Sequence, residues 1–102
     1  MFEWDAKKNT ANIAKHGVGL ELAQRIFDGP VLTATGDRED YGELRKIGIG
    51  MVYGIAFLTV SHTDRRGKVR IVSARPASPK ERRRYEETLR QAHDHFRDRS
   101  RR

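Results

Sequence analysis

The sequence predicts an α+β fold in a single domain, with a helical hairpin at the amino end, an antiparallel sheet of about four strands, and a carboxyl-terminal helix packed on that sheet. Three observations predict it. Apolar residues recur at helical spacing before residue 30, β-branched and aromatic residues broken by Gly fill residues 31–75, and a capped helical pattern begins at Ser78. A chain of 102 residues is long enough for one modest core and too short for two.

The amino-terminal segment predicts a short strand followed by two helices. Phe2 and Trp4 alternate with polar residues, as on a strand with one buried face. Asp5 can cap a helix over residues 6–16, and Gly17 supplies the left-handed residue that ends it. A second, more apolar helix follows almost at once and ends at a Gly-Pro pair, and its apolar residues are Leu20, Ala23, Ile26 and Phe27.

The middle of the chain predicts four strands, because β-branched residues and short Gly-containing links alternate there. The segments are residues 31–36, 44–51, 55–62 and 68–75. Short links favour antiparallel pairing, with a turn at residues 52–54 and a hairpin whose Gly67 takes positive φ. The acidic stretch over residues 36–43 is predicted to be a loop.

The last helix has a defined beginning in the sequence Ser78-Pro79-Lys80-Glu81. A capping Ser, a Pro at the first helical position and a Glu at the third satisfy the first free amides of a helix. An apolar stripe then predicts one helix face against the sheet, and it comprises Tyr85, Leu89, Ala92 and Phe96. We expect the domain to span residues 1–96 and residues 97–102 to form a disordered basic tail.

Positive charge is concentrated in the carboxyl-terminal third of the chain. Residues 1–64 hold 7 Lys and Arg against 9 Asp and Glu, a net of −2, while residues 65–102 hold 14 against 5, a net of +9, and the two sum to +7. Such a region attracts phosphates, so nucleic acid is the expected partner. Cys is absent, and the longest apolar run, residues 55–58, is too short to span a membrane. We therefore expect a cytoplasmic protein that does not contact membranes.

The last strand and the last helix carry cations and a phenol, which are groups that RNA cleavage without a metal would require. Such cleavage needs a base, an acid, and cations that bear the charge growing on phosphorus. Strand alternation predicts that Val69, Ile71, Ser73 and Arg75 share one face, with Arg75 at the strand end as the transition-state stabiliser. The candidate catalytic residues are Arg75, His62, His16, Arg83 and Tyr85.

Some of these residues can also be explained by a structural role without catalysis. His16 precedes Gly17 and can serve as a helix-ending cation, and the spacing of Tyr85 favours the core. We assign no metal and no cofactor. Exposed cations would bind the RNA backbone, and these are Lys8, Lys15, Arg65, Arg66, Arg70, Lys80 and Arg82. The alternative function is a nucleic-acid-binding or transcriptional-regulatory module without catalysis.

Four stretches of the chain resemble the BrnT family, toxins of type II toxin-antitoxin systems. They are FEWDAKKNTANIAKHGV (residues 2–18), IFDGP (26–30), IG (49–50) and RIVSARPASPKERRRYE (70–86). The resemblance implies a RelE-like fold, a metal-independent endoribonuclease that stops growth, and a small BrnA-like antitoxin through which the complex binds promoter DNA. The chain departs from the family pattern at Lys46, where an aromatic residue is frequent, and at Gly29, where an acid is.

Overall fold

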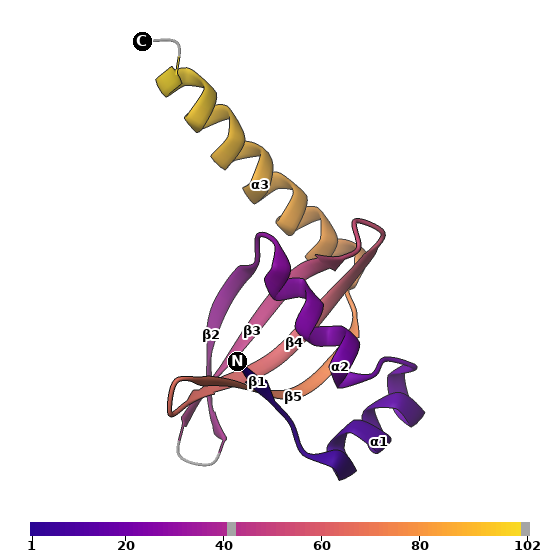
Figure 1. The fold of residues 1–102 in the computed structure, drawn as a ribbon. Coiled ribbons are helices and arrows are strands. Elements are labelled where there is room, and N and C mark those ends of the chain that lie inside the picture. Colours follow the sequence, from indigo (N-terminus) through magenta and orange to yellow (C-terminus); the bar gives the residue numbers. More distant parts are fainter. Residues whose placement is uncertain (41–42, 101–102) are drawn as a thin grey trace.

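The computed structural model describes residues 1–40 and 43–100, and the side chains at residues 1–35 and 43–92 (Figure 1). Helix α2 lies across a curved sheet, α1 lies next to the sheet at β5, and α3 extends away from the sheet. In chain order the elements are β1 (Phe2–Glu3), α1 (Ala6–His16), α2 (Leu20–Ala23), the 3-10 helix η1 (Gln24–Asp28), β2 (Leu32–Asp40), β3 (Glu43–Val52), β4 (Ala56–Arg65), β5 (Lys68–Pro76) and α3 (Pro79–Ser100).

The sheet has five strands in the order β1-β5-β4-β3-β2. Strands β2 to β5 pair antiparallel, as predicted, and the structure shows that they follow one another across the sheet as a meander. The fifth strand is β1, which pairs parallel to β5 through Phe2 with Val69 and Glu3 with Arg70. The sheet is therefore mixed rather than purely antiparallel, because the chain returns its last strand to the edge where it began.

The first helix confirms its predicted bounds and caps. The Asp5 carboxylate accepts the backbone amides of Lys7 and Lys8 at 2.8 and 3.1 Å. Those two amide hydrogen bonds hold the pKa of Asp5 below its usual value. Gly17 ends the helix at φ 71° and donates its amide to the Ile13 carbonyl. The free backbone amides at the first turn and a free carbonyl at the last turn are thus hydrogen-bonded by the residues that flank the helix.

The second predicted helix is only partly regular. Residues 20–23 form one turn of α2, and the chain then tightens into the 3-10 helix η1. The prediction of two regular helices in a hairpin is therefore wrong in this detail. A single helical turn has almost no stability of its own, so packing against the sheet decides its geometry. Its apolar residues Leu20, Ala23 and Ile26 are all fully buried.

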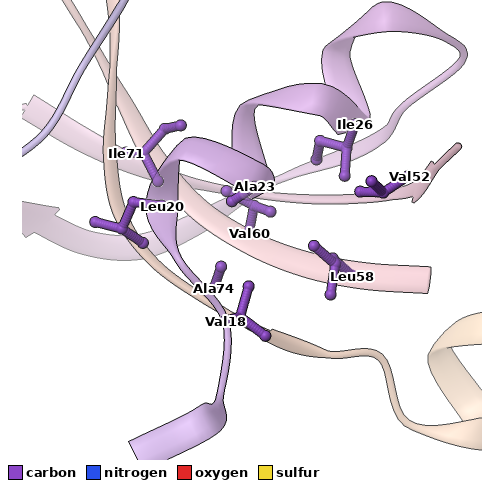
Figure 2. Packing of buried hydrophobic residues seen from close by; sticks show 9 residues of the cluster. All are labelled: Val18, Leu20, Ala23, Ile26, Val52, Leu58, Val60, Ile71 and Ala74. Atoms are coloured by element: carbon purple, nitrogen blue, oxygen red, sulfur yellow. The ribbon is translucent and has the colours of Figure 1, made fainter. Parts of the chain in front are cut away.

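Two glycines of β3 let η1 and the residues that follow it approach the sheet closely. A Cβ on Gly50 would lie 2.8 Å from Cβ of Ile26, and one on Gly48 would lie 2.9 Å from Cγ1 of Val31. Only Gly leaves room for this contact. Figure 2 shows the resulting core, with α2 and η1 side chains directed at β4 and β5, and it comprises Val18, Leu20, Ala23, Ile26, Val52, Leu58, Val60, Ile71 and Ala74.

The predicted acidic loop is partly a strand. β2 continues to Asp40, paired with β3, and its register shifts between Thr35 and Glu39. Backbone pairing overrides the polar composition, and charged residues are common on an edge strand, where they discourage pairing with other chains. Both predicted hairpins are present. The first turns through Tyr53 and Gly54 and the second through Arg66 and Gly67, all at positive φ.

The carboxyl-terminal helix leaves the sheet after its first turns (Figure 1). Tyr85 is 4% exposed, but Leu89 is 41% exposed, so the predicted stripe is buried only at its start. Phe96 lies outside the described side chains. No Gly or Pro follows Pro79, and α3 runs to Ser100, past the boundary predicted at residue 96. Leu89 and Ala92 line an open groove beside Met51 and Phe57.

Candidate active site

A β-bulge sets which side chains of β5 share a face. The β4 and β5 pairing runs Ser61 with Ser73 and then His62 with Ile71, so Val72 is the extra residue. The prediction that Ile71 and Arg75 share a face is therefore wrong. Ile71 belongs to the buried core, whereas Ser73 and Arg75 turn to the opposite face of the sheet.

The face that carries Arg75 is polar and only partly covered. On β4 it presents Thr59 and Ser61, which stand opposite Arg75 and Ser73 in the register. Arg70 also belongs to this face, beyond the bulge, and its guanidinium lies 2.9 Å from the Glu3 carboxylate. Thr59 is buried and its hydroxyl donates to Glu81. The hydroxyls of Ser61 and Ser73 and the Arg75 guanidinium belong to side chains that are at least partly exposed, and such groups can donate hydrogen bonds to a phosphate backbone.

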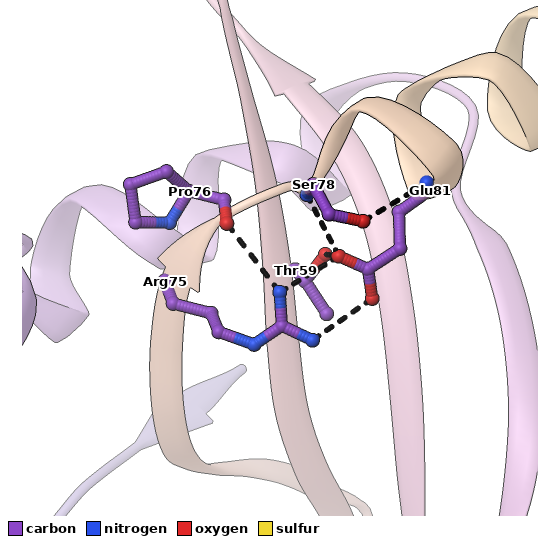
Figure 3. Close-up of polar contacts among 5 residues, drawn as sticks. All are labelled: Thr59, Arg75, Pro76, Ser78 and Glu81. Atoms are coloured by element: carbon purple, nitrogen blue, oxygen red, sulfur yellow. Dashed lines mark hydrogen bonds and ion pairs between the residues drawn. The ribbon is translucent and has the colours of Figure 1, made fainter.

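Arg75 is held by the first turn of α3 (Figure 3). Its Nη1 and Nη2 atoms donate to Oε1 and Oε2 of Glu81 at 2.7 and 2.9 Å, a bidentate ion pair. Glu81 Oε1 also accepts from the Ser78 amide at 2.9 Å and the Thr59 hydroxyl at 3.1 Å. The strand end and the helix start therefore converge on one carboxylate.

The charges of this cluster reinforce one another. The Arg75 guanidinium, with the Ser78 amide and the Thr59 hydroxyl, lowers the pKa of Glu81 to about 2. The Glu81 carboxylate in turn raises the pKa of Arg75. Both groups are fully ionised near neutral pH. The Arg75 side chain remains 44% exposed, so its outward edge is open to a ligand.

The predicted capping box at the start of α3 is confirmed. The Glu81 amide donates to Oγ of Ser78 at 3.2 Å, and Glu81 accepts the Ser78 amide in return. The sequence assigned Glu81 to this cap alone and missed its pairing with Arg75. An Arg six residues before a capping Glu is a weak signal, because a turn of the chain must bring the two together.

Asn12 is a second residue that sequence reasoning missed. Its side-chain amide donates to Ala74 O at 2.8 Å and accepts the Ala74 amide at 3.1 Å, as a residue of a neighbouring strand would. The same Nδ2 donates to Val18 O at 2.8 Å. Asn12 thus closes the β5 edge next to Arg75 and ties α1 to it.

His62 lies in the core rather than beside Arg75. It is 4% exposed, its ring meets Phe27 edge-on at 5.1 Å, and neither ring nitrogen has a hydrogen-bond partner among the described residues. On β4 it shares a face with Leu58 and Val60, opposite to that of Thr59. The structure therefore separates His62 from Arg75 by the thickness of the sheet.

The burial of His62 predicts a loss of stability in acid. Desolvation lowers the pKa of His62 below 6.5, opposed by Asp64 and assisted by Lys46. Below pH 6.5 the unfolded chain takes up a proton that the folded chain refuses, so stability falls as pH falls until the folded pKa is reached. Urea denaturation between pH 7.5 and 5 should show a slope of up to about 1.4 kcal/mol per pH unit from this group.

The matched variant for this prediction is His62→Leu, which fills a similar volume without a titrating group. Its stability should vary less with pH over the same range than that of the unaltered protein. Identical pH dependence of the two proteins would show that His62 is not the group responsible.

The other predicted catalytic residues lie at different places. Tyr85 is buried, and its hydroxyl donates to Pro30 O at 2.9 Å, while burial raises its pKa. Its ring packs edge-on against Phe57, and the Arg82 guanidinium lies over the Phe57 ring, 4.4 Å from the centroid. Arg83 is exposed on α3. His16 ends α1 and is partly exposed.

Apart from Arg70, the predicted RNA-binding cations lie in three regions. Arg65 and Arg66 line one pocket with Lys68 and Glu3 at the β4-β5 hairpin. Lys80 and Arg82 belong to the first turns of α3, near the Arg75 cluster. Lys8 and Lys15 stand on α1.

Among the residues that the structure describes, no three His, Asp or Glu side chains come together in a metal-binding arrangement. Over the same residues, no helix combines the length and the apolar character needed to cross a membrane.

Comparisons with known proteins identify the family. A model of the family described as the ribonuclease toxin BrnT of type II toxin-antitoxin systems matches residues 4–81. The chain is also similar to the crystal structure of the Brucella abortus ribonuclease toxin BrnT, with 26% sequence identity and a TM-score of 0.59, covering 76% of this chain and 97% of that one. A search of the curated proteins found no match.

The family match includes Arg75 and Glu81 and ends before Arg83 and Tyr85. It confirms the family that the sequence motifs indicated, whereas the RelE-like relation stays a prediction. Because the match covers well over half of the sequence, this chain belongs to the BrnT family of ribonuclease toxins of type II toxin-antitoxin systems.

Proposed function

We propose that this ribonuclease toxin cleaves RNA, chiefly messenger RNA, at a phosphate bound by Arg75, and that it does so in the cytoplasm without a metal ion. Loss of message then stops translation and growth. The observation that carries the proposal is the exposed Arg75 guanidinium at the junction of β5 and α3. It is an anchored, partly exposed cation at the end of a polar face, within the part of the chain that the family shares.

The main requirement for RNA cleavage is stabilisation of the negative charge that develops on the phosphate in the transition state. The ribose 2′-hydroxyl gives up its proton and its oxygen bonds to phosphorus. The bond from phosphorus to the 5′-oxygen then breaks, the 5′-oxygen takes up a proton, and a 2′,3′-cyclic phosphate remains. Negative charge grows on the other phosphate oxygens between these events. A fixed guanidinium stabilises that charge, because its donors are already oriented when the charge develops. The start of α3 lies beside Arg75 and contributes the positive end of its helix dipole.

Proton transfer is assigned to His16 in this proposal. Asn12 binds the residue next to Arg75, and His16 follows Asn12 by one helical turn on the same side of α1. Of the two histidines whose side chains are described, His16 alone is in contact with solvent. The burial of His62 and the Pro30 hydrogen bond of Tyr85 favour structural roles for both.

The RNA backbone would follow the cations around this face. Arg70 continues the row from Arg75 along β5, and the pocket at Arg65 and Arg66 extends it to the hairpin. Lys80, Arg82 and Arg83 provide charge on the α3 side. Binding through such contacts weakens with salt, because each phosphate contact releases counterions.

The test is cleavage of single-stranded RNA by the purified toxin in excess EDTA. We expect products to accumulate at the same rate with and without the chelator, because side chains alone supply the charge and the proton transfers. Products that vanish in EDTA and return with Mg²⁺ would overturn the metal-independent chemistry. RNA binding with no cleavage under either condition would favour a binding module.

Membership of a type II family pairs this toxin with an antitoxin protein. The proposal adds that the antitoxin is BrnA-like, that it covers the cationic face with an acidic segment, and that the complex reaches promoter DNA only through it. Opposite charges would speed association and occlude Arg75 together. An association rate that is independent of salt would contradict the electrostatic part.

A further inference from the structure

Glu81 makes more contacts than a helix cap requires. The capping box uses one bond, from the Ser78 amide to Oε1. The carboxylate adds the Thr59 hydroxyl and both terminal nitrogens of Arg75. Three groups thereby hold the carboxylate, as Figure 3 shows: the Ser78 amide at the helix start, the Thr59 hydroxyl on β4 and the Arg75 guanidinium on β5.

This arrangement restricts the orientation of the Arg75 side chain but leaves some of its N–H donors free of protein partners. A guanidinium has five N–H groups in a rigid plane. Glu81 accepts one from each terminal nitrogen, and the Pro76 carbonyl is a longer contact at 3.4 Å. The Nε–H and the remaining outward hydrogen stay available to an anion.

We infer that Glu81 is a positioning residue for RNA cleavage, acting through Arg75; the inference rests on the proposed role of Arg75. A long exposed Arg side chain loses much rotamer freedom when it binds a phosphate. Because Glu81 has already removed that freedom, the guanidinium meets the transition state in its working orientation. The carboxylate has an opposing effect, since its negative charge weakens the attraction of this face for RNA.

These two effects predict an unusual pair of kinetic changes in Glu81→Gln. Gln can still accept the Ser78 amide and the Thr59 hydroxyl, so the cap survives. We expect kcat to fall about 10- to 100-fold because Arg75 loses its bidentate partner. KM for RNA should stay unchanged or decrease, because the face gains one unit of positive charge. A purely structural role would lower the fraction of folded protein without this split.

Two companion variants complete the experiment. Ser78→Ala removes the other half of the cap but leaves the Arg75 pair, so it should lower the melting temperature and keep the wild-type kcat. Thr59→Val removes one support of the carboxylate and should lower kcat to a smaller extent than Glu81→Gln. It provides the same readout if Glu81→Gln folds poorly.

The outcomes separate the inference from the proposed function. A folded Glu81→Gln protein with wild-type kcat, while Arg75→Ala is inactive, would overturn the positioning role and leave the Arg75 site standing. Full activity of Arg75→Ala would overturn both. A fall in kcat for Glu81→Gln with KM unchanged or lower, and wild-type kcat in Ser78→Ala, would establish the positioning role.

Discussion

Arg75→Ala is expected to reduce RNA cleavage by about 10²- to 10³-fold, the loss seen when one preorganised transition-state donor is removed. The protein should stay folded, because an ion pair this exposed contributes little to stability and Glu81 keeps the Ser78 amide and the Thr59 hydroxyl. Initial rates on a single-stranded RNA, with circular dichroism as the measure of folding, would check both statements.

The matched control is Arg90→Ala, which removes the same unit charge from the exposed surface of α3, away from the cluster. Its rate should remain within about twofold of the wild type at moderate salt, because a distant exposed charge is screened. Arg75→Lys should be intermediate, since Lys keeps the charge but cannot pair in a bidentate manner. Equal losses in Arg75→Ala and Arg90→Ala would reduce the role of Arg75 to general charge.

Asn12→Ala is expected to cost about 2 to 4 kcal/mol of stability, because it leaves buried backbone groups without partners. The Ala74 amide and carbonyl and the Val18 carbonyl all bind this side chain. They lie at the junction of α1 and the β5 edge, where no strand can replace the lost bonds. Urea denaturation followed by Trp4 fluorescence would measure the change.

Two variants on the same helix test the assignment to Asn12. Thr10→Ala removes an exposed hydroxyl that binds only the Ala6 carbonyl within α1, and its effect should stay below about 0.5 kcal/mol. Asn12→Asp keeps the acceptor for the Ala74 amide but sets a carboxylate against two carbonyl oxygens, so it should also destabilise. A stable Asn12→Ala protein would show that the β5 edge is closed by other contacts.

Local features of the fold were predictable because they depend on residues within a few positions of one another. The cap at Asp5, the ending of α1 at Gly17, the capping box at Ser78 and the turn at Gly67 all form as the sequence indicates. Each satisfies backbone groups or a positive φ through a neighbouring residue. The family motifs are also local strings, and the family match confirms what they indicated.

The candidate site was predictable only in part. Arg75 and the start of α3 do meet, as the pattern of cations indicated. His62 was expected beside Arg75 but lies on the other face of the sheet. Alternation along a strand shows which side chains share a face, but it does not show which of the two faces the helices cover. The same limit hid Asn12, which acts on Ala74, 62 positions away.

The sequence by itself determined the helix ends, the hairpin turns, the segments able to form strands and the family of the protein, because neighbouring residues encode these features. Only the tertiary structure decided the bulge at Val72, which puts Arg75 and Ile71 on different faces of the sheet. It also decided the parallel pairing of β1, the burial of His62 and the second role of Glu81. Each of these depends on strand register or on packing between segments that are distant in the sequence, and both are fixed only when the complete sheet and its core have formed.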